Sequence, residues 1–284
     1  MTCCNSRRKP EWLKIKLPKG QSSTEVLNIV RKHNLHTICT SGMCPNQGEC
    51  WGNRTATFMI GGDVCTRSCK FCNVKTGRPA PLDPAEPENI ANSVKLLGLK
   101  HAVITSVDRD DLADLGAAHW VKVIEAVKRV NPETTMEVLI PDFQGRRELV
   151  QQVIDTRPEV ISHNLETVRE LSDGVRSRAK YDISLQVIRQ VSESGIVSKS
   201  GIMLGLGETR EQILQTMDDL LAVGCKVMTI GQYLQPSEAN LEVKEYVTPE
   251  TFQEYERIGL EKGFRYVESG PLVRSSYHAE KHVR

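Results

Sequence analysis

The chain has 284 residues, 39% of them hydrophobic, and its 37 Lys and Arg nearly balance its 36 Asp and Glu. This balance gives no electrostatic basis for binding nucleic acid or an anionic membrane surface, and no apolar run approaches the roughly 18 residues of a membrane span. The N-terminus lacks the apolar stretch of a signal peptide. We therefore expect a cytoplasmic protein whose clustered cysteines serve a metal or a reaction rather than disulfides.

Residues 1–25 are predicted to form an irregular arm, and from Thr55 onward β-rich runs alternate with helical patterns. The predicted strands are Thr57–Ile60, Ala102–Val107, Thr135–Ile140, Val160–His163, Val197–Leu204 and Lys226–Tyr233. The predicted helices are Glu88–Leu97, Ala117–Val130, Gly145–Thr156, Ile183–Ser194, Thr209–Val223 and Pro249–Glu261. Residues 81–89, rich in proline and acidic side chains, are predicted to be a linker into the first of these helices.

Two of the helices carry clear end signals. Thr209 and Gln212 have the spacing of a capping box, and Gly224 is expected to end the same helix. Thr248 before Pro249 is typical of an N-cap followed by the first helical residue.

Alternating strands and helices of this length predict an α/β fold with a parallel sheet and crossover helices. About six βα units fit a partial (β/α)6 TIM-like barrel, and the chain lacks the glycine-rich fingerprint of a dinucleotide-binding fold. We expect an N-terminal extension (1–54), the barrel (55–265) and a C-terminal tail (266–284). Because barrel active sites lie at the C-terminal ends of strands, chemistry is expected just beyond Ile60.

Six of the nine cysteines lie between Cys39 and Cys72 and form two triplets of different spacing. The first triplet is Cys39, Cys44 and Cys50, and the second is Cys65, Cys69 and Cys72. Three thiolates from one loop can hold three corners of a cubane iron–sulfur cluster and leave one iron open for a substrate or cofactor. The two triplets therefore predict two clusters and a redox or radical enzyme.

Other interpretations of the cysteines remain open. The second triplet also has the spacing of one helical face, although Gly61 and Gly62 before it are poor residues for a core helix. A structural zinc site is a stronger alternative, but each site would need a fourth ligand. Arg67 and Lys70 are expected to lower the pKa of the neighbouring thiols.

The first triplet is less specific by itself. Pro45, Asn46 and Gly48 favour an ordered loop rather than a helix around it. Its spacing supplies no fourth ligand. Cys3 and Cys4 lie at a terminus and are poor candidates, and Cys225 is more typical of a core residue.

The C-x3-C-x2-C loop, with Phe71 directly before its last cysteine, resembles the radical S-adenosylmethionine (SAM) superfamily. The first triplet and several stretches resemble the lipoyl synthase family within it: PEWLKIKLP (10–18), TSGMCPNQGECW (40–51), TSVDRDDL (105–112), SHNLETV (162–168), SGIMLGLGE (200–208), GQYLQPS (231–237) and GPLVRSSYHAE (270–280). This resemblance runs from about Pro10 to the C-terminal end. It implies insertion of two sulfur atoms, at carbons six and eight of an octanoyl chain on a carrier-protein lysine, with one SAM consumed for each hydrogen removed.

The resemblance also implies two 4Fe-4S clusters and SAM as cofactors. Cys65, Cys69 and Cys72 match the radical-generating cluster, whose open iron binds SAM. Cys39, Cys44 and Cys50 match an auxiliary cluster that is sacrificed as the sulfur donor. Ser275 matches the fourth ligand of the auxiliary cluster. A serine oxygen is a harder ligand than a thiolate, so we expect this bond to be the weak one when sulfide leaves.

The other candidate cofactor contacts mostly follow predicted strands. They are Phe71, Asp108, Arg109, Asp110, Asn164, Glu166, Arg176, Met203, Gln232 and Tyr233. Without the resemblance, the aspartates fit a solvated loop, His163 fits a buried hydrogen-bond network, and residues 201–205 fit an ordinary buried strand.

The expected partners are an octanoylated lipoyl carrier domain (a dehydrogenase E2 subunit or the glycine-cleavage H protein), a ferredoxin or flavodoxin reductant, and cluster-assembly proteins. We expect the extension and the tail to cover the barrel mouth, so that the substrate lies between the two clusters. Three rival functions stay open: a methylthiotransferase or biotin synthase-like enzyme, a two-cluster electron-transfer protein, and a zinc-stabilised binding module. The first rival should lack both the Cys39 spacing and the Arg274–Tyr277 motif.

Overall fold

The computed structural model describes residues 9–14, 21–32, 35–52 and 57–283. The strands of its main sheet are β1 (His36–Thr37), β2 (Thr57–Ile60), β5 (His101–Ser106), β6 (Thr135–Leu139), β7 (Val160–Ser162), β8 (Val197–Leu204), β9 (Val227–Gln232) and β10 (Tyr266–Gly270). A second sheet pairs β3 (Val64–Cys65) with β4 (Lys75–Thr76). The Cys3 and Cys4 candidates lie outside the described residues.

The α-helices are α1 (Gln21–Lys32), α2 (Ile38–Ser41), α3 (Gln47–Gly52), α4 (Glu86–Leu97), α5 (Ala117–Val130), α6 (Arg147–Asp155), α7 (Arg169–Val175), α8 (Tyr181–Glu193), α9 (Arg210–Ala222) and α10 (Pro249–Lys262). The described residues also form the short 3-10 helices η1 (Glu11–Leu13), η2 (Phe143–Gly145) and η3 (Ala279–Val283). In the described part of the chain, none of these helices is long and apolar enough to span a bilayer.

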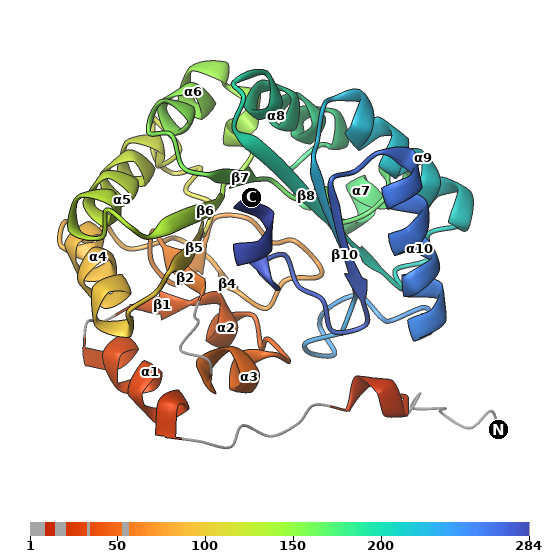
Figure 1. Cartoon of the computed structure of the whole chain (residues 1–284), viewed down its shortest axis with the longest axis horizontal. Helices are drawn as coiled ribbons and strands as arrows, with labels where there is room; N and C mark the ends of the chain where they lie inside the picture. Colours follow the sequence, from red (N-terminus) through yellow and green to blue (C-terminus); the bar gives the residue numbers. More distant parts are fainter. Residues whose placement is uncertain (1–8, 15–20, 33–34, 53–56, 284) are drawn as a thin grey trace.

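The main sheet follows the order β1-β2-β5-β6-β7-β8-β9-β10. All neighbours from β2 to β10 are parallel, whereas β1 runs antiparallel to β2. The sheet curls into an open barrel with α4, α5, α6, α8, α9 and α10 around its outside (Figure 1). The predicted partial α/β barrel is confirmed, with one more parallel strand than the six predicted.

Burial explains why these segments form strands. Every residue of β2 and of β9 is buried, as expected for a parallel sheet whose outer face is covered by helices. One half of the core joins the outer face of the first strands to α4–α6, with Ile104 and Val138 near Val94 and Val123. The other half joins β8 and β9 to α9 and α10 through residues such as Met217.

The predicted helix ends are confirmed at both positions. Thr209 and Gln212 form a complete capping box at the start of α9. The amide of Gly224, which has φ +82°, donates to the carbonyl of Leu221 just beyond that helix. Thr248 caps α10, and Pro249 is its first residue.

Three local predictions were wrong. The irregular arm does not extend to residue 25, because α1 begins at Gln21. The linker ends at Ala85, since Glu86 already starts α4. The first cysteine triplet does not lie in a loop without helix: Thr37 caps α2 through its hydroxyl, and α3 follows within six residues. The cap from Thr37 starts α2 despite the glycines nearby.

The two ends of the described chain meet the barrel at different places. In the extension, β1 pairs with β2, and α1 packs on α3 and α4. Residues 266–270, assigned to the tail from the sequence, form β10 beside β9. The rest of the tail turns into the barrel, where η3 lies in its centre and contacts β5 and β6 (Figure 1).

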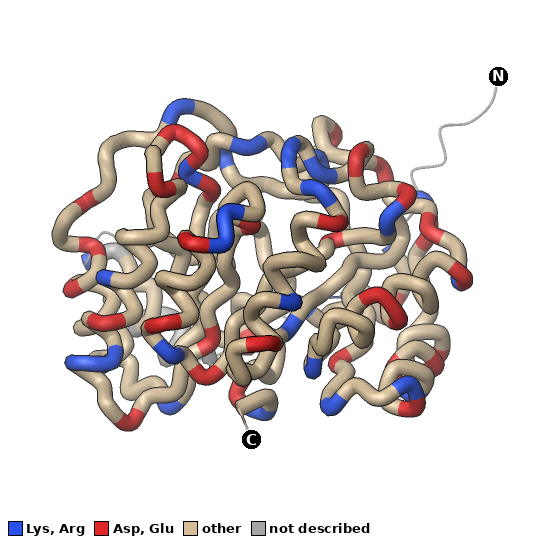
Figure 2. Tube along the Cα trace, turned by 90° about the horizontal axis from the view of Figure 1, so that it is seen from above, with Lys and Arg blue, Asp and Glu red and all other residues tan. Residues whose placement is uncertain are grey.

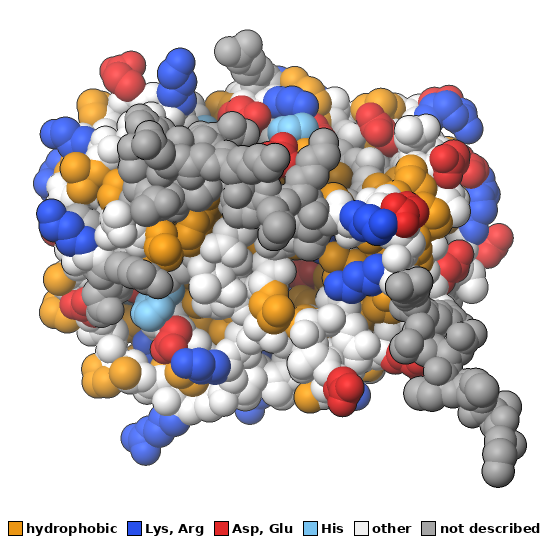
Figure 3. Space-filling view, turned by 90° about the horizontal axis from the view of Figure 1, so that it is seen from below, with side chains coloured by type: hydrophobic (Ala, Val, Ile, Leu, Met, Phe, Trp, Pro, Cys, Tyr) orange, Lys and Arg blue, Asp and Glu red, His pale blue; other side chains and the backbone are white. Residues whose placement is uncertain are grey.

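The molecular surface is mixed. Lys and Arg are interspersed with Asp and Glu along the outer elements (Figure 2). Hydrophobic side chains appear in small groups among charged ones on the face seen from below (Figure 3).

Candidate active site

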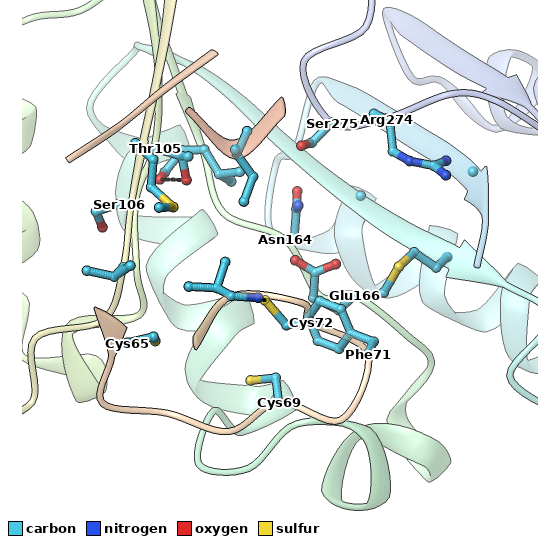
Figure 4. Close-up of a pocket in the computed structure, with 18 of the residues that line it drawn as sticks. Cys65, Cys69, Phe71, Cys72, Thr105, Ser106, Asn164, Glu166, Arg274 and Ser275 are labelled. Atoms are coloured by element: carbon cyan, nitrogen blue, oxygen red, sulfur yellow. Dashed lines mark hydrogen bonds between the residues drawn. The ribbon is translucent and has the colours of Figure 1, made fainter. Parts of the chain in front are cut away.

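A cavity of about 290 Å³ opens at the C-terminal ends of the barrel strands. The second cysteine triplet lines it on one side, together with Phe71, and the tail lines it with Val273, Arg274 and Ser275. Figure 4 shows Ser275 across the cavity from Cys69 and Cys72, with Asn164 and Glu166 between them. The structure therefore brings together residues that are about 200 positions apart in the chain.

The loop that carries the second triplet is irregular and well supported. It begins at Gly61 and Gly62, whose φ values of +82° and +100° favour glycine. The amide of Thr66 donates to the carbonyl of Asp108, and the amide of Lys70 donates to that of Val175. The cysteines therefore do not form a helical stripe. All three face one cavity, as ligands of a common group would.

Arg67, inside this loop, is almost fully buried and is surrounded by carboxylates. Its guanidinium lies 3.3 Å from Asp108, 2.8 Å from Asp110 and 2.8 Å from Asp142. Burial opposes ionisation of Asp110, but the hydrogen bonds from Arg67 outweigh it and lower the pKa of Asp110 to about 2. Burial raises the pKa of Asp108 to about 6, against the effect of Arg67. Arg67 thus joins the cysteine loop to the ends of β5 and β6.

The expectation that basic neighbours lower the thiol pKa values was wrong. Burial, followed by the nearby Asp108 carboxylate, raises the pKa of Cys65 to about 12. Burial also raises the pKa of Cys72 to about 11. The charge of Arg67 is already compensated by aspartates, so ionisation of these thiols requires the positive charge of a metal.

The first triplet lies close to the tail. Burial raises the pKa of Cys50 to about 12, and the charges of Cys39 and Cys44 add to this shift. Asn46, between the two short helices, donates from its amide to the carbonyl of Leu272 at 2.7 Å. Ile38 of α2 belongs to the cavity lining, whereas none of the three thiols does. The triplet therefore lies just behind the wall that contains Ser275.

Both cysteine triplets fit iron–sulfur clusters better than a single metal ion. Among the described residues, no three His, Cys, Asp or Glu side chains converge closely enough to hold a single metal ion. The indole N–H of Trp51 is buried without a hydrogen-bond partner in the described part of the chain, and it lies near enough to Cys39 to favour its thiolate. Ligated thiolates would satisfy this donor, so the thiol-rich donor sets fit the clusters.

Arg274 gives a second sign of an anionic occupant. Burial lowers the pKa of Arg274, and the nearby Cys44 thiolate opposes that shift. The ion pairs of the described residues include none with Arg274, whose guanidinium donates to the carbonyl of Val273. A partly buried cation is stabilised by a negative partner, which an anionic thiolate-bound cluster would supply.

Five predicted cofactor contacts line the cavity with the cysteines: Phe71, Asp108, Asn164, Glu166 and Met203. The amide oxygen of Asn164 is buried and has no hydrogen-bond partner among the described residues. At Gly201 a Cβ atom would lie only 3.2 Å from that oxygen and 2.3 Å from the hydroxyl of Thr229. The absence of a side chain at Gly201 therefore leaves room for a ligand that Asn164 can bind.

The other predicted contacts are placed differently. Asp110 is engaged by Arg67, and Arg109 donates to the carbonyl of Gly61 and to Asp111. Arg176 lines an adjoining hollow of about 140 Å³ and donates to Ser184.

Gln232 and Tyr233 lie outside the residues that line the cavity. Gln232 donates to the carbonyls of Leu204, Tyr233 and Glu245, and accepts from the amide of Val247. The hydroxyl of Tyr233 donates to the carbonyl of Leu241. Sequence reasoning missed Thr229 and gave Arg274 no separate role, although both line the cavity. The alternation of inward and outward side chains along β9 could have identified Thr229 as a cavity residue.

A family model described as the Radical SAM superfamily matches residues 59–220. The chain is 69% identical over 283 residues to a lipoyl synthase of Treponema denticola, covering 100% of this chain and 97% of that protein. It is 64% identical over 276 residues to a lipoyl synthase of Parabacteroides distasonis, covering 97% of this chain and 98% of that protein.

Two solved structures share the fold at low sequence identity. Methylornithine synthase (PylB) has a TM-score of 0.59 at 14% identity, over 88% of this chain and 75% of that chain. Streptococcus suis SuiB bound to S-adenosylmethionine has a TM-score of 0.60 at 12% identity, over 86% of this chain and 53% of that chain. The family comparisons confirm the predicted resemblance and do not support the rival functions.

Proposed function

Because this chain belongs to the lipoyl synthase family of the radical SAM superfamily, we propose that its cavity is the place where sulfur is inserted into an octanoyl chain. It is a radical SAM enzyme that inserts sulfur, at carbons six and eight of an octanoyl chain on a carrier-protein lysine. The observation that carries the proposal is the placement of one cysteine triplet and Ser275 on opposite sides of one cavity.

Cys65, Cys69 and Cys72 are proposed to hold the radical-generating 4Fe-4S cluster. When bound, this cluster and SAM supply the radical chemistry needed at an unactivated C–H bond, where side chains alone have no acid–base route. The protein contributes position. The contacts of Thr66 and Lys70 fix the loop, and its thiols face the side of the cavity that contains Asn164 and Glu166.

SAM is proposed to lie against Asn164, Glu166 and Met203, with Phe71 beside it. The unpartnered oxygen of Asn164 supports this placement, because a bound amine would satisfy it. Burial raises the pKa of Glu166, against the effect of the Arg176 charge, so a cationic ligand beside it would be stabilised. Asp108 is a further candidate, whereas Arg109 and Asp110 are proposed to position the loop through Gly61 and Arg67.

The second 4Fe-4S cluster is proposed to bind Cys39, Cys44, Cys50 and Ser275, with Arg274 as its neighbouring positive charge. The hydrogen bond from Asn46 to Leu272 supports this set, because it joins the triplet to the segment that carries the serine.

The substrate is proposed to enter from a lipoyl carrier domain. The cavity has apolar lining residues, including Met59, Val107, Leu139 and Ile202, which suit a fatty chain. The carrier is a dehydrogenase E2 subunit or the glycine-cleavage H protein, the electron donor a ferredoxin or flavodoxin, and cluster-assembly proteins supply the clusters. We place these reactions in the cytoplasm, where thiols stay reduced.

The test uses protein purified without oxygen. Two cubane clusters require about eight iron and eight sulfide per chain. Incubation with SAM, dithionite and an octanoyl-lysine peptide should give 5′-deoxyadenosine and peptide masses with one and then two added sulfurs. Iron sufficient for only one cluster would refute the auxiliary site. SAM cleavage without any sulfur-containing peptide would refute the proposed role of the cavity.

A further inference from the structure

A buried polar layer lies below the cavity, away from the residues assigned above. The ammonium of Lys199 donates to the carboxylate of Glu137 at 2.9 Å, and the hydroxyl of Ser162 donates to the other oxygen of that carboxylate at 2.9 Å. Nδ1 of His282 lies 3.3 Å from the same ammonium. All four side chains have 0% exposure. We call these four residues the barrel anchor.

The barrel anchor lies one inward-facing position below the cavity wall. Along a strand, every second side chain points to the same face. Leu139 and Gly201 line the cavity, and Glu137 and Lys199 precede them by two residues on β6 and β8. Ser162 on β7 pairs with Lys199 in the sheet register. Three neighbouring strands therefore contribute to one layer, and His282 on η3 reaches it from the tail.

The hydrogen bonding defines the state of His282. An ammonium group can only donate, so Nδ1 of the imidazole must accept and the ring proton is on Nε2. Burial and the charge of Lys199 lower the pKa of His282 to about 3, which keeps the ring neutral. Nε2 lies 3.9 Å from Glu268 of β10, too far for a hydrogen bond. The hydrogen bond of His282 in this layer is thus the one from Lys199.

The tail between the sheet and this layer carries Ser275. Val273 lies against Gly231 of β9, and Leu272 accepts the hydrogen bond from Asn46. Beyond Ser275, the chain turns back into the barrel, and Ala279 and His282 are buried there. The segment from Val273 to His282 is therefore held at both ends, and Ser275 lies between the two attachments.

We propose that Lys199, oriented by Glu137 and Ser162, is the fixed donor that holds His282, and that this contact positions Ser275 at the cavity. These are positioning residues. A buried ion pair is seldom more stabilising than apolar side chains of the same volume. Its value here is specificity, because the Lys199 ammonium, held by Glu137 and Ser162, donates to an acceptor in one fixed place. The effect on Ser275 rests on the proposed function, whereas the ordering of the tail does not.

The test measures hydrogen exchange of residues 275–283 in the purified protein, together with SAM cleavage and sulfur insertion. In H282A the Lys199 donor loses its acceptor, and we expect exchange of these amides to become at least ~10-fold faster. Sulfur insertion should fall with it, while SAM cleavage stays within about twofold of the unaltered protein. This split distinguishes positioning of the tail from general loss of structure.

Two matched variants complete the test. E280Q changes an exposed side chain in the same η3 segment and should behave as the unaltered protein. H282N offers an amide oxygen near the position of Nδ1 and should recover part of the slow exchange. The double variant E137Q/K199M removes both charges at similar volume, and should speed tail exchange without changing exchange in the outer helices.

Unchanged exchange in H282A would overturn the proposal, as would an H282N protein no better than H282A. Equal losses of SAM cleavage and sulfur insertion would also overturn it. If the unaltered protein forms no sulfur-containing product while the exchange results hold, the proposed function falls and the anchoring of the tail stands.

Discussion

Adding one methyl group at Gly231 should slow sulfur insertion far more than it slows SAM cleavage. A Cβ atom at Gly231 would lie 2.2 Å from the carbonyl oxygen of Val273, and ordinary van der Waals contact begins at 3.4 Å. Gly231 is paired on both sides, with Met203 of β8 and Gly270 of β10, so β9 has no room to withdraw. The tail must move instead, by about 1.2 Å if the whole shortfall is taken by Val273.

The consequence of Gly231→Ala follows from this displacement. Ser275 is two residues beyond Val273, and a misplacement of about 1 Å near a reacting centre can cost ~100-fold in rate. We expect sulfur insertion to fall by about that factor, while SAM cleavage at the Cys65 loop changes by less than ~3-fold. The assay is anaerobic turnover with an octanoyl-lysine peptide, with 5′-deoxyadenosine and sulfur-containing products quantified in the same samples.

The control is Gly174→Ala. No atom lies within 4 Å of a Cβ placed at Gly174, in the exposed part of α7. This variant should keep both activities. If Gly231→Ala inserts sulfur as fast as the unaltered protein, or loses SAM cleavage to the same extent, the geometric argument for the tail is refuted.

Three further predictions concern the site and its support. Arg67→Met leaves three aspartates, two of them with side chains at most 5% exposed, without their common cation. The free energy of unfolding should therefore fall by about 3–5 kcal/mol at pH 8 and by less at pH 5, measured by anaerobic urea denaturation. Burial lowers the pKa of His163 to about 4, so between pH 6.5 and 4 the unfolded chain binds a proton that the folded chain does not. The free energy of unfolding should therefore fall by about 3 kcal/mol as the pH drops from 6.5 to 4. H163Q should lack this part of the pH dependence, and an H163Q protein with the same pH dependence as the unaltered protein would contradict the role of His163. Ser275→Cys should retain the auxiliary cluster by iron analysis but slow sulfur insertion by at least about 10-fold, because a thiolate releases iron less readily; unchanged turnover would count against the serine ligand.

The strands and outer helices were predictable because local and tertiary signals agree there. β2, β8 and α5 have the predicted bounds, and α9 has the predicted cap. β10 was missed because its burial is mixed, with Glu268 and Ser269 half-exposed, so no apolar run marks it. Its strand conformation depends on parallel pairing with β9, a contact across the fold that the sequence does not display.

The predicted cofactor contacts show that a position at the end of a strand is not enough to identify a residue that lines the cavity. On β9, Thr229 and Gly231 line the cavity, so period-two alternation directs Gln232 to the other face, where it bonds the loop at Glu245 and Val247. The prediction at Gln232 used the end of the strand and ignored its alternation. Asn164 and Glu166 were predicted correctly as cavity residues, and they are two residues apart, as alternation requires.

The two proposed ligand sets also differ in what a sequence can reveal about them. Cys65, Cys69 and Cys72 belong to one loop whose supports, at Asp108 and Val175, hold it from outside, so their common purpose is visible from spacing alone. The proposed auxiliary set is divided between the first 50 residues and the tail, and only the fold joins these two segments, through the hydrogen bond from Asn46 to Leu272. A ligand that is far along the chain from the other ligands of its cluster needs contacts of its own that hold it near them. The proposed role of the barrel anchor meets this need, because the anchor would hold the tail against three barrel strands rather than against the extension.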